Sequence, residues 1–174
     1  MTKQTKYEMS AEAEEYIKDS TELLHLYRPP ITIWNLQFVL LSIVRFIHQF
    51  FLDYDYFEMA GRQICILLHM MEVDIIQAVS LERERQDTKH PMTENYPMDT
   101  WRLILLEEYG EMVKEYNDIV TNAGLSQDTN IDELKTQFQK NFVNECVQFL
   151  AVIVRYIEWG NCSITTESQE DEEE

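Results

Sequence analysis

Glycine and proline are scarce in this chain, and this scarcity constrains its fold more than any other feature. Four glycines and four prolines occur among 174 residues, whereas short strands joined by tight turns need many residues of both types. Apolar residues make up 45% of the chain, which is enough to build a buried core. We therefore expect an all-α protein in which a few long helices form one helical bundle.

Apolar residues at helical spacing indicate about five helices, over residues 11–27, 32–53, 56–86, 100–120 and 131–159. Ser10, Asp99 and Asn130 are the expected N-caps. Arg28-Pro29-Pro30 should end the first helix, and Gly160-Asn161 the last. The sequence predicts three parts: an N-terminal helical extension packed on the core (1–72), a helical core (73–160) and a disordered acidic tail (161–174).

Three of the expected helices, at 32–53, 56–86 and 131–159, are apolar over more than one narrow stripe. A helix of this kind needs to be buried on two sides. One small bundle cannot easily bury three such helices. We therefore expect a homodimer or a homotetramer, with helices at the interface.

The formal net charge of −18 limits the classes of partner. Such a surface repels a nucleic-acid backbone, so direct DNA or RNA binding is not expected. Two interpretations of the acidic side chains remain open: they keep the protein soluble, or they bind cations. A third and weaker interpretation is that they mimic the charge of a nucleic acid towards a basic protein partner. Residues 31–52 form the only stretch long enough to suggest a membrane span, but polar side chains interrupt them. No secretory signal is apparent, so we expect no membrane contact and a cytoplasmic location, in the host if the chain is viral.

Four glutamates are the most informative candidates for a binding site. Glu107, Glu108 and Glu111 lie three and four residues apart, so they project near one another from one helix. Taken alone, they are better explained as a solvated face of a very acidic protein. Glu145, however, lies on an apolar face of the last helix, where a carboxylate needs a partner or a metal. Two antiparallel helices carrying these side chains would suit Mg²⁺, which prefers a few carboxylate oxygens.

Three motifs in order resemble a known family. In chain order they are the run from Glu82 to Lys89 followed by Trp101, then Glu107-Glu108-Tyr109-Gly110-Glu111, then Glu145-Cys146-Val147-Gln148. Over about residues 73–159 the chain resembles the MazG-like all-α nucleoside triphosphate pyrophosphohydrolases, whose pattern is E-E-x-x-E on one helix and E-x-x-D on the next. The phage-type branch is the most similar. Gln148 stands where the wider family has an aspartate, and the connection from Glu111 to Glu145 is longer than usual.

The resemblance implies hydrolysis of a (d)NTP to (d)NMP and pyrophosphate with Mg²⁺ as cofactor. It gives the following expected roles: Glu107, Glu108, Glu111 and Glu145 as metal ligands, Gln148 as a weak ligand or a hydrogen-bond partner of metal-bound water, and Glu108 and Glu111 as catalytic residues. Lys89, Arg83, Arg85 and Lys114 are candidates for phosphate binding, and Trp101 for the wall of a base pocket. For Arg83 and Arg85, ion pairs within the helix with neighbouring glutamates are at least as good an interpretation.

A second class of function stays open. The chain is alternatively a catalytically weak or inactive MazG-like phage protein, acting as an acidic protein-binding module through its acidic surface or N-terminal helices. An inhibitor of a host defence protein is one example. Gln148 and the unmatched residues 1–72 favour this alternative, whereas the retained glutamates favour the enzyme.

Overall fold

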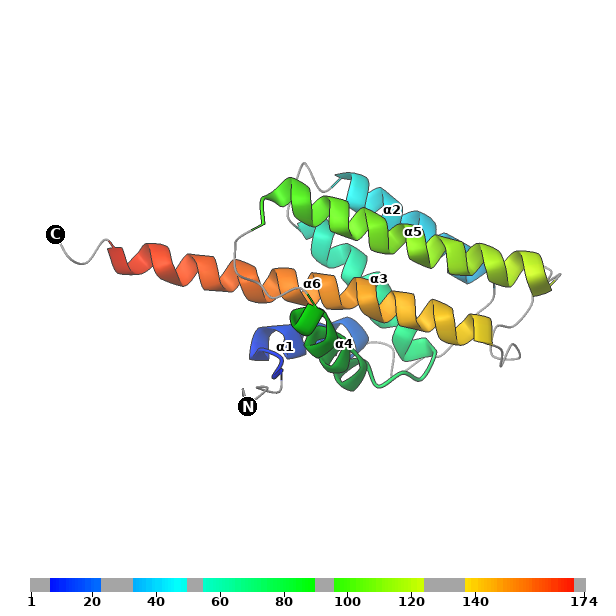
Figure 1. Cartoon of the computed structure of the whole chain (residues 1–174), viewed down its shortest axis with the longest axis horizontal. Coiled ribbons are helices and arrows are strands. Elements are labelled where there is room, and N and C mark those ends of the chain that lie inside the picture. The colour runs from blue at the N-terminus through cyan, green and yellow to red at the C-terminus, as the bar shows by residue number, and fades with distance from the viewer. Residues whose placement is uncertain (1–6, 23–32, 50–54, 90–95, 124–136, 171–174) are drawn as a thin grey trace.

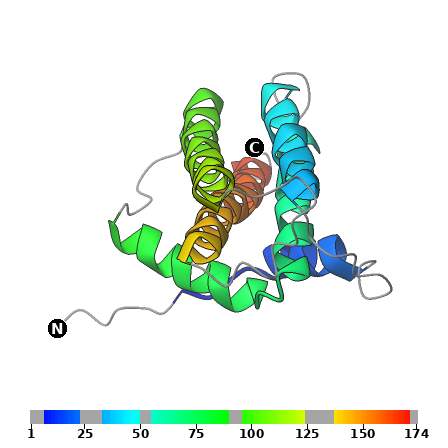
Figure 2. The same ribbon diagram turned by 90° about the vertical axis from the view of Figure 1, so that its right-hand side faces the viewer.

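The computed structural model describes residues 7–22, 33–49, 55–89, 96–123 and 137–170. These residues form six helices and no strand, which confirms the all-α helical bundle. The helices are α1 (Ala11–Glu22), α2 (Ile33–Gln49), α3 (Asp55–Met70), α4 (Ile75–Lys89), α5 (Met98–Ala123) and α6 (Gln137–Glu170). The long helices α5 and α6 run side by side in opposite directions (Figure 1), and α4 crosses beneath them (Figure 2).

Helix α6 is the centre of the bundle. It contacts α5, α4, α3 and α1, and every residue from 149 to 155 is buried. Phe142, Phe149 and Leu150 belong to one core cluster together with Ile17 of α1 and Ile64 of α3. One chain therefore buries α6 on all sides along this stretch, so its broad apolar surface does not by itself require a second subunit.

The helix expected over 56–86 is two helices, α3 and α4, separated by residues 71–74. Glu72 has a positive φ of 60°, Val73 N donates to Leu68 O at 3.0 Å, and Glu72 N donates to His69 O at 3.0 Å. This is the hydrogen-bond pattern of a Schellman motif, in which glycine usually occupies the left-handed position. Glutamate stands there instead, so neither Gly nor Pro marks the break. Asp74 then caps α4 by accepting from Gln77 N at 3.2 Å.

Other helix ends agree only in part with the expected ones. Ser10 caps α1 as expected, because its Oγ accepts from Ala13 N at 3.2 Å. Helix α5 begins at Met98, before the expected cap Asp99, and Thr100 N donates to Pro97 O at 2.9 Å. The expected end of the last helix at Gly160 was wrong, because α6 continues to Glu170. The expected stop at residues 28–30 and the cap at Asn130 lie outside the described residues.

None of the six described helices is, on its own, long and apolar enough to cross a membrane. The segments Glu58–Met70 and Ile75–Lys89 pass that test of length and composition only when taken together, and the chain bends by 120° between them.

Candidate metal centre and adjoining cleft

Aromatic contacts show the register between α5 and α6. The Trp101 ring lies 5.9 Å from the ring of Tyr156 and 6.1 Å from that of Trp159, measured between centroids. Because the helices are antiparallel, two turns forward on α5 correspond to two turns back on α6. Glu108 on α5 therefore lies opposite Gln148 on α6. One turn further along α5, Glu111 lies opposite Glu145, which is one turn before Gln148 on α6.

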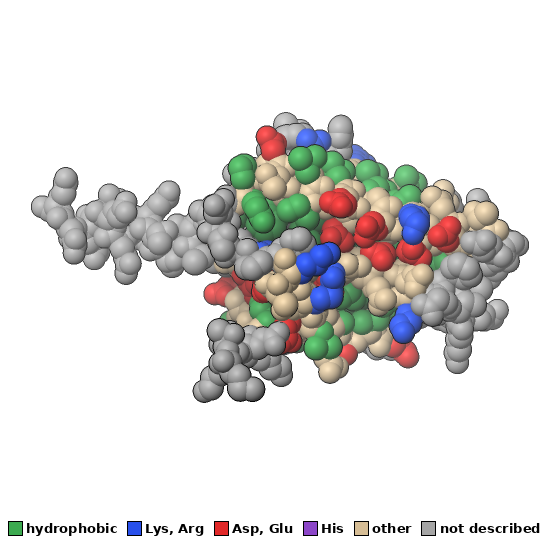
Figure 3. Space-filling model, in the orientation of Figure 1, with side chains coloured by type: hydrophobic (Ala, Val, Ile, Leu, Met, Phe, Trp, Pro, Cys, Tyr) green, Lys and Arg blue, Asp and Glu red, His purple; other side chains and the backbone are tan. Residues whose placement is uncertain are grey.

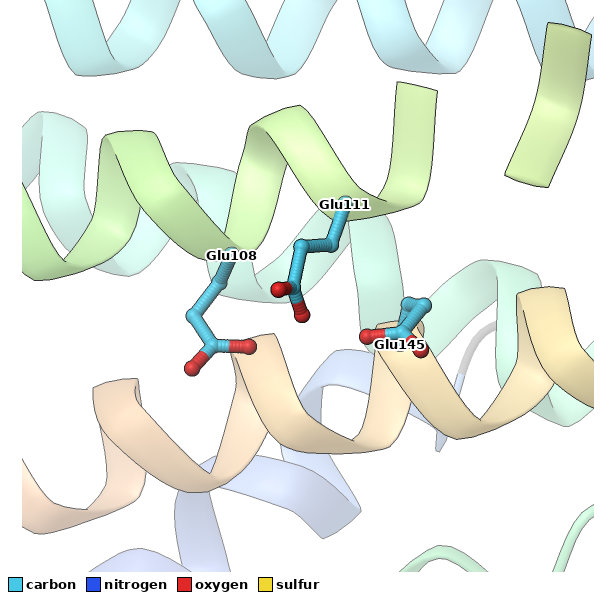
Figure 4. A group of neighbouring side chains, drawn as sticks. All are labelled: Glu108, Glu111 and Glu145. Carbon is cyan, nitrogen blue, oxygen red and sulfur yellow. The ribbon is translucent and has the colours of Figure 1, made fainter. Parts of the chain in front are cut away.

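The carboxyl groups of Glu108, Glu111 and Glu145 point into one space between the two helices (Figure 4). One oxygen from each lies within 4.8 Å of the others. Three negative charges this close repel one another strongly unless protons or a cation intervene. The cluster therefore has the composition and spacing of a hard-cation site built entirely from oxygen atoms.

The surroundings of the cluster disfavour three separate negative charges. The pKa of Glu108 is raised to about 7, chiefly by burial and additionally by the negative charges of Glu111, Glu145, Glu82 and Glu107. Burial also raises the pKa of Glu145 to about 7, helped by its hydrogen bond with Glu111 and by nearby acidic charge.

A divalent cation fits this donor set. Glu108 Oε2 is buried and has no hydrogen-bond partner among the described residues. An acceptor in that position is costly to leave without a partner. A cation bound by the three carboxylates would compensate both the unpartnered oxygen and the excess negative charge.

A chain of hydrogen bonds reaches the cluster from α4. Arg85 donates to both oxygens of Glu82, at 2.7 and 2.6 Å, and Gln86 Nε2 donates to Glu82 Oε1 at 3.0 Å. Arg85 Nη2 also donates to Gln148 Oε1 at 3.0 Å. Gln148 Nε2 donates in turn to Glu145 Oε2 at 2.7 Å. Both ends of the Gln148 amide are therefore engaged.

A cleft of about 430 Å³ opens beside the cluster, between α4, α5 and α6. Acidic side chains gather in a band along this face, with basic side chains next to them (Figure 3). Glu107, Glu108 and Glu111 line one part of the cleft. Trp101, Tyr96, Ile104 and Val152 supply apolar surface, and Arg85, Lys89 and Arg155 supply positive charge. The cleft thus combines carboxylates, basic side chains and an apolar wall that includes aromatic rings.

Most of the residues predicted for the site meet at this cleft. Glu107 lies on its exposed edge, outside the group of three carboxylates, and Lys89 and Trp101 line it. Trp101 is 1% exposed and also stacks edge-on against Tyr96, with centroids 5.6 Å apart. Lys114 does not line the cleft. Its exposed ammonium pairs with Glu115 at 3.1 Å, and its charge lowers the pKa of Glu145, against the larger effects of burial and acidic neighbours.

Arg83 does not line the cleft either, although Arg85 does. Its guanidinium is buried and pairs with Asp87 at 3.1 Å and with Glu158 of α6 at 3.6 Å. Glu158 also accepts from Tyr7 Oη at 2.6 Å and from Ser10 N at 3.0 Å, so this network joins α4 and α6 to the start of α1. Arg83 therefore pairs within its own helix with an aspartate, Asp87, whereas Arg85 makes the glutamate pair of the alternative interpretation, with Glu82.

Two charged residues at the site were missed from the sequence, as were the apolar residues Tyr96, Ile104 and Val152 of the cleft wall. Glu82 lies close enough for its charge to raise the pKa of Glu108, and Arg155 lines the cleft with only 7% of its surface exposed. Glu82 belongs to the charged run that the motifs include, where its spacing from Arg85 was the available signal. Nothing in the local pattern distinguishes Arg155, because its position on the cleft depends on how α6 packs against α4.

No protein-family model, curated protein or solved structure matches this chain. The resemblance to the MazG-like proteins rests on the sequence motifs.

Proposed function

We propose that this chain is a Mg²⁺-dependent nucleoside triphosphate pyrophosphohydrolase that cleaves a (d)NTP to the (d)NMP and pyrophosphate. One observation carries the proposal. Glu108, Glu111 and Glu145 bring carboxylate oxygens from two helices within 4.8 Å of one another, beside a cleft that basic side chains also line. Phosphate esters need this pairing, because a metal ion and basic side chains share the charge of the phosphate chain.

The proposed roles follow from where each side chain lies. Glu108, Glu111 and Glu145 would hold Mg²⁺, with Glu107 at the exposed edge. When bound, the ion would neutralise phosphate charge and lower the pKa of a coordinated water. Lys89 and Arg85 would donate to phosphate oxygens from the α4 side of the cleft.

The apolar wall would receive the rest of the substrate. The half-buried Tyr96 and Ile104 offer surface on which a base can pack, with the buried Trp101 behind them, and Val152 closes the wall from α6. A volume of about 430 Å³ lies within the usual range for small-molecule sites. Burial of the base there would exclude water from one side of the phosphate chain and fix its orientation to the carboxylates.

Pyrophosphate release from each of the NTPs and dNTPs, assayed with and without Mg²⁺, tests the proposal directly. We expect turnover of at least one nucleotide with Mg²⁺, and loss of about 100-fold or more in rate for Glu108→Gln, as for removal of a group that stabilises transition-state charge. Glu12→Gln, an exposed change on α1, is the matched control. Absence of turnover with every nucleotide, in a chain that melts cooperatively, would overturn the proposed activity.

A second candidate is a protein-binding module, and exposed apolar side chains on the described surface favour it. Phe38 and Leu41 of α2 are 64% and 59% exposed, and Leu103 of α5 is 66% exposed. Where exposed apolar side chains are contiguous they mark contact surfaces, and Phe38 and Leu41, three residues apart on α2, are the candidates here, either for a partner protein or for a second copy of this chain. A chain without nucleotide turnover that still binds Mg²⁺ would leave this candidate ahead.

A further inference from the structure

Gln148 of α6 lies between α4 and the carboxylate cluster, hydrogen-bonded to Arg85 and to Glu145, so the orientation of its amide affects what the centre can hold. The side chain lies between a cation and an anion: Arg85 on one side, at 3.0 Å, and Glu145 on the other, at 2.7 Å. Only one orientation of the amide suits both neighbours. Its oxygen must face the guanidinium and its NH₂ group the carboxylate, because the reverse would oppose donor to donor and acceptor to acceptor.

This orientation removes the amide oxygen from the metal. Oxygen is the atom of a glutamine that binds Mg²⁺, and in Gln148 it accepts from Arg85. Arg85 is itself fixed by two hydrogen bonds to Glu82. The Gln148 amide is therefore held by Arg85 of α4 with its NH₂ group directed at Glu145.

The same contacts leave little for a second ion. The oxygens of Glu82 accept three hydrogen bonds, two from Arg85 and one from Gln86. The guanidinium of Arg85 adds positive charge beside Gln148, where a second cation would need an acidic ligand. Glu107 lies on the exposed edge of the cleft, outside the group of carboxylates whose oxygens converge, which is Glu108, Glu111 and Glu145.

We propose that Gln148 is a positioning residue, fixed by Arg85, that orients the Glu145 carboxylate and limits this centre to one divalent cation. The inference rests on the proposed metal centre and specifies its stoichiometry. Hydrogen-bond partners of metal ligands typically contribute about 10- to 100-fold to metal affinity, so the role of Gln148 is measurable without any substrate.

Titration calorimetry with Mn²⁺ is the first test. The wild-type chain should bind one ion, and Gln148→Leu should still bind one ion, with a dissociation constant about 10-fold higher. Gln77→Leu, which changes an exposed glutamine on α4 away from the cleft, should bind as the wild type does. Two ions per wild-type chain, or an unchanged affinity in Gln148→Leu, would overturn the proposal.

The number of waters on bound Mn²⁺ separates positioning from ligation. Electron spin echo spectra in D₂O count these waters, and the number should be the same in the wild type and in Gln148→Leu. One additional water in Gln148→Leu would show that the amide oxygen had been a ligand, and would overturn the positioning role. Circular dichroism of both proteins checks that the helices are retained.

A double-mutant cycle tests the part assigned to Arg85. The effect of Gln148→Leu on the dissociation constant should fall from about 10-fold to about 2-fold in an Arg85→Met background, because the amide is then no longer fixed. The direct effect of the arginine charge on the ion cancels in this comparison. An equal effect in both backgrounds would contradict the role of Arg85.

Failure of this inference is distinguishable from failure of the proposed function. If the wild-type chain binds no Mn²⁺, or if Glu108→Gln binds it unchanged, the metal centre is absent and both fail. If Glu108→Gln loses the ion while Gln148→Leu binds as the wild type does, the inference alone fails.

Discussion

The carboxyl groups of Glu111 and Glu145 face each other from neighbouring antiparallel helices, with oxygens within 4.8 Å. A hydrogen bond between them is one cause of the raised pKa of Glu145. Because Glu108 and Glu145 both have pKa values raised to about 7, the centre without metal binds protons more readily near neutral pH than ordinary carboxylates do. Proton uptake and metal uptake should therefore compete, and the first two predictions follow from this competition.

Without metal, the free energy of unfolding should fall as the pH rises towards 7. The folded chain holds Glu108 and Glu145 with pKa values of about 7, whereas the ordinary value is 4.5. Between these two values the folded state binds more protons than the unfolded state, so raising the pH favours unfolding, and the effect levels off above 7. Both groups keep partial contact with solvent, so we discount the contribution to about 1–2 kcal/mol, or about 3–6 °C in Tm.

Thermal melts in EDTA from about pH 5 to 8 measure this dependence. Repulsion among the many other carboxylates also grows with pH, so the comparison with Glu108→Gln is the critical one. That variant should show a shallower decline in Tm. An identical slope in the two proteins would contradict the assignment of proton binding to this cluster.

Mg²⁺ should raise Tm, and more so at about pH 8 than at about pH 5.5, because the ligands must lose their protons to bind the ion. At ten times its dissociation constant, an ion that binds only the folded state stabilises by about 1.4 kcal/mol, or about 3–5 °C. Melts should be compared at matched ionic strength in NaCl, because the net charge of −18 makes the chain sensitive to screening. Glu108→Gln should lose the response and Glu12→Gln should keep it. A response that NaCl reproduces would count against a specific site.

Lys89→Met should raise KM for the nucleotide by about 10- to 15-fold with little change in kcat, if the proposed activity is present. Lys89 lines the cleft on α4 and is exposed, and a charge-assisted hydrogen bond of this kind contributes about 1.5 kcal/mol to binding. A contact made equally to substrate and transition state affects KM alone. Lys140→Met on α6, outside the cleft, is the control. Equal KM values in the two variants would remove Lys89 from the phosphate site.

Arg83 and Arg85 should respond in opposite ways to substitution by Met. The Arg83 side chain is 5% exposed and that of Arg85 is 52% exposed. Removing Arg83 leaves Asp87 and Glu158 with less compensation, so we expect a loss of about 3 kcal/mol, near 10 °C in Tm, and unchanged affinity for Mn²⁺ at 20 °C. Arg85→Met should change Tm by only about 1–2 °C and should alter metal binding. The reverse pattern would show that Arg83 belongs to the site.

These two arginines also show where sequence reasoning reached its limit. Helical spacing is a local property, so it brought Glu108 and Glu111 to one face of α5 and allowed Glu145 to meet them. Arg83 and Arg85 lie two residues apart on α4 and so face different neighbours. Which of them meets the cleft depends on the angle at which α4 crosses α6, and no local pattern records that angle.

The number of helices was predicted less well, for a related reason. The break between α3 and α4 is made by a left-handed Glu72, without the glycine that usually marks such an end. The broad apolar surface of the last helix predicted burial on two sides. In the structure four other helices of the same chain supply that burial. A homodimer or homotetramer stays a prediction, for which the exposed Phe38 and Leu41 are now the better argument.

Two glycines should respond in opposite ways to substitution by alanine, and so test both the packing and the candidate site. Gly61 of α3 lies against Tyr16 of α1 and Ile153 of α6, so an added Cβ has no room. Tyr16 donates to Glu58 O at 2.6 Å and cannot move away without losing that bond. We expect Gly61→Ala to cost about 1–3 kcal/mol.

Gly110 of α5 lies among the candidate ligands, yet nothing is within 4 Å of the position that a Cβ would take. Alanine is favoured over glycine inside a helix by about 1 kcal/mol, so Gly110→Ala should raise Tm by about 2–4 °C. Mn²⁺ affinity should be unchanged, because the added methyl group touches none of the three carboxylates. Urea melts and thermal melts of both variants, with Mn²⁺ titrations of Gly110→Ala, measure these effects. Weaker Mn²⁺ binding in Gly110→Ala would contradict this expectation. It would mean that the added methyl group interferes with metal binding on α5.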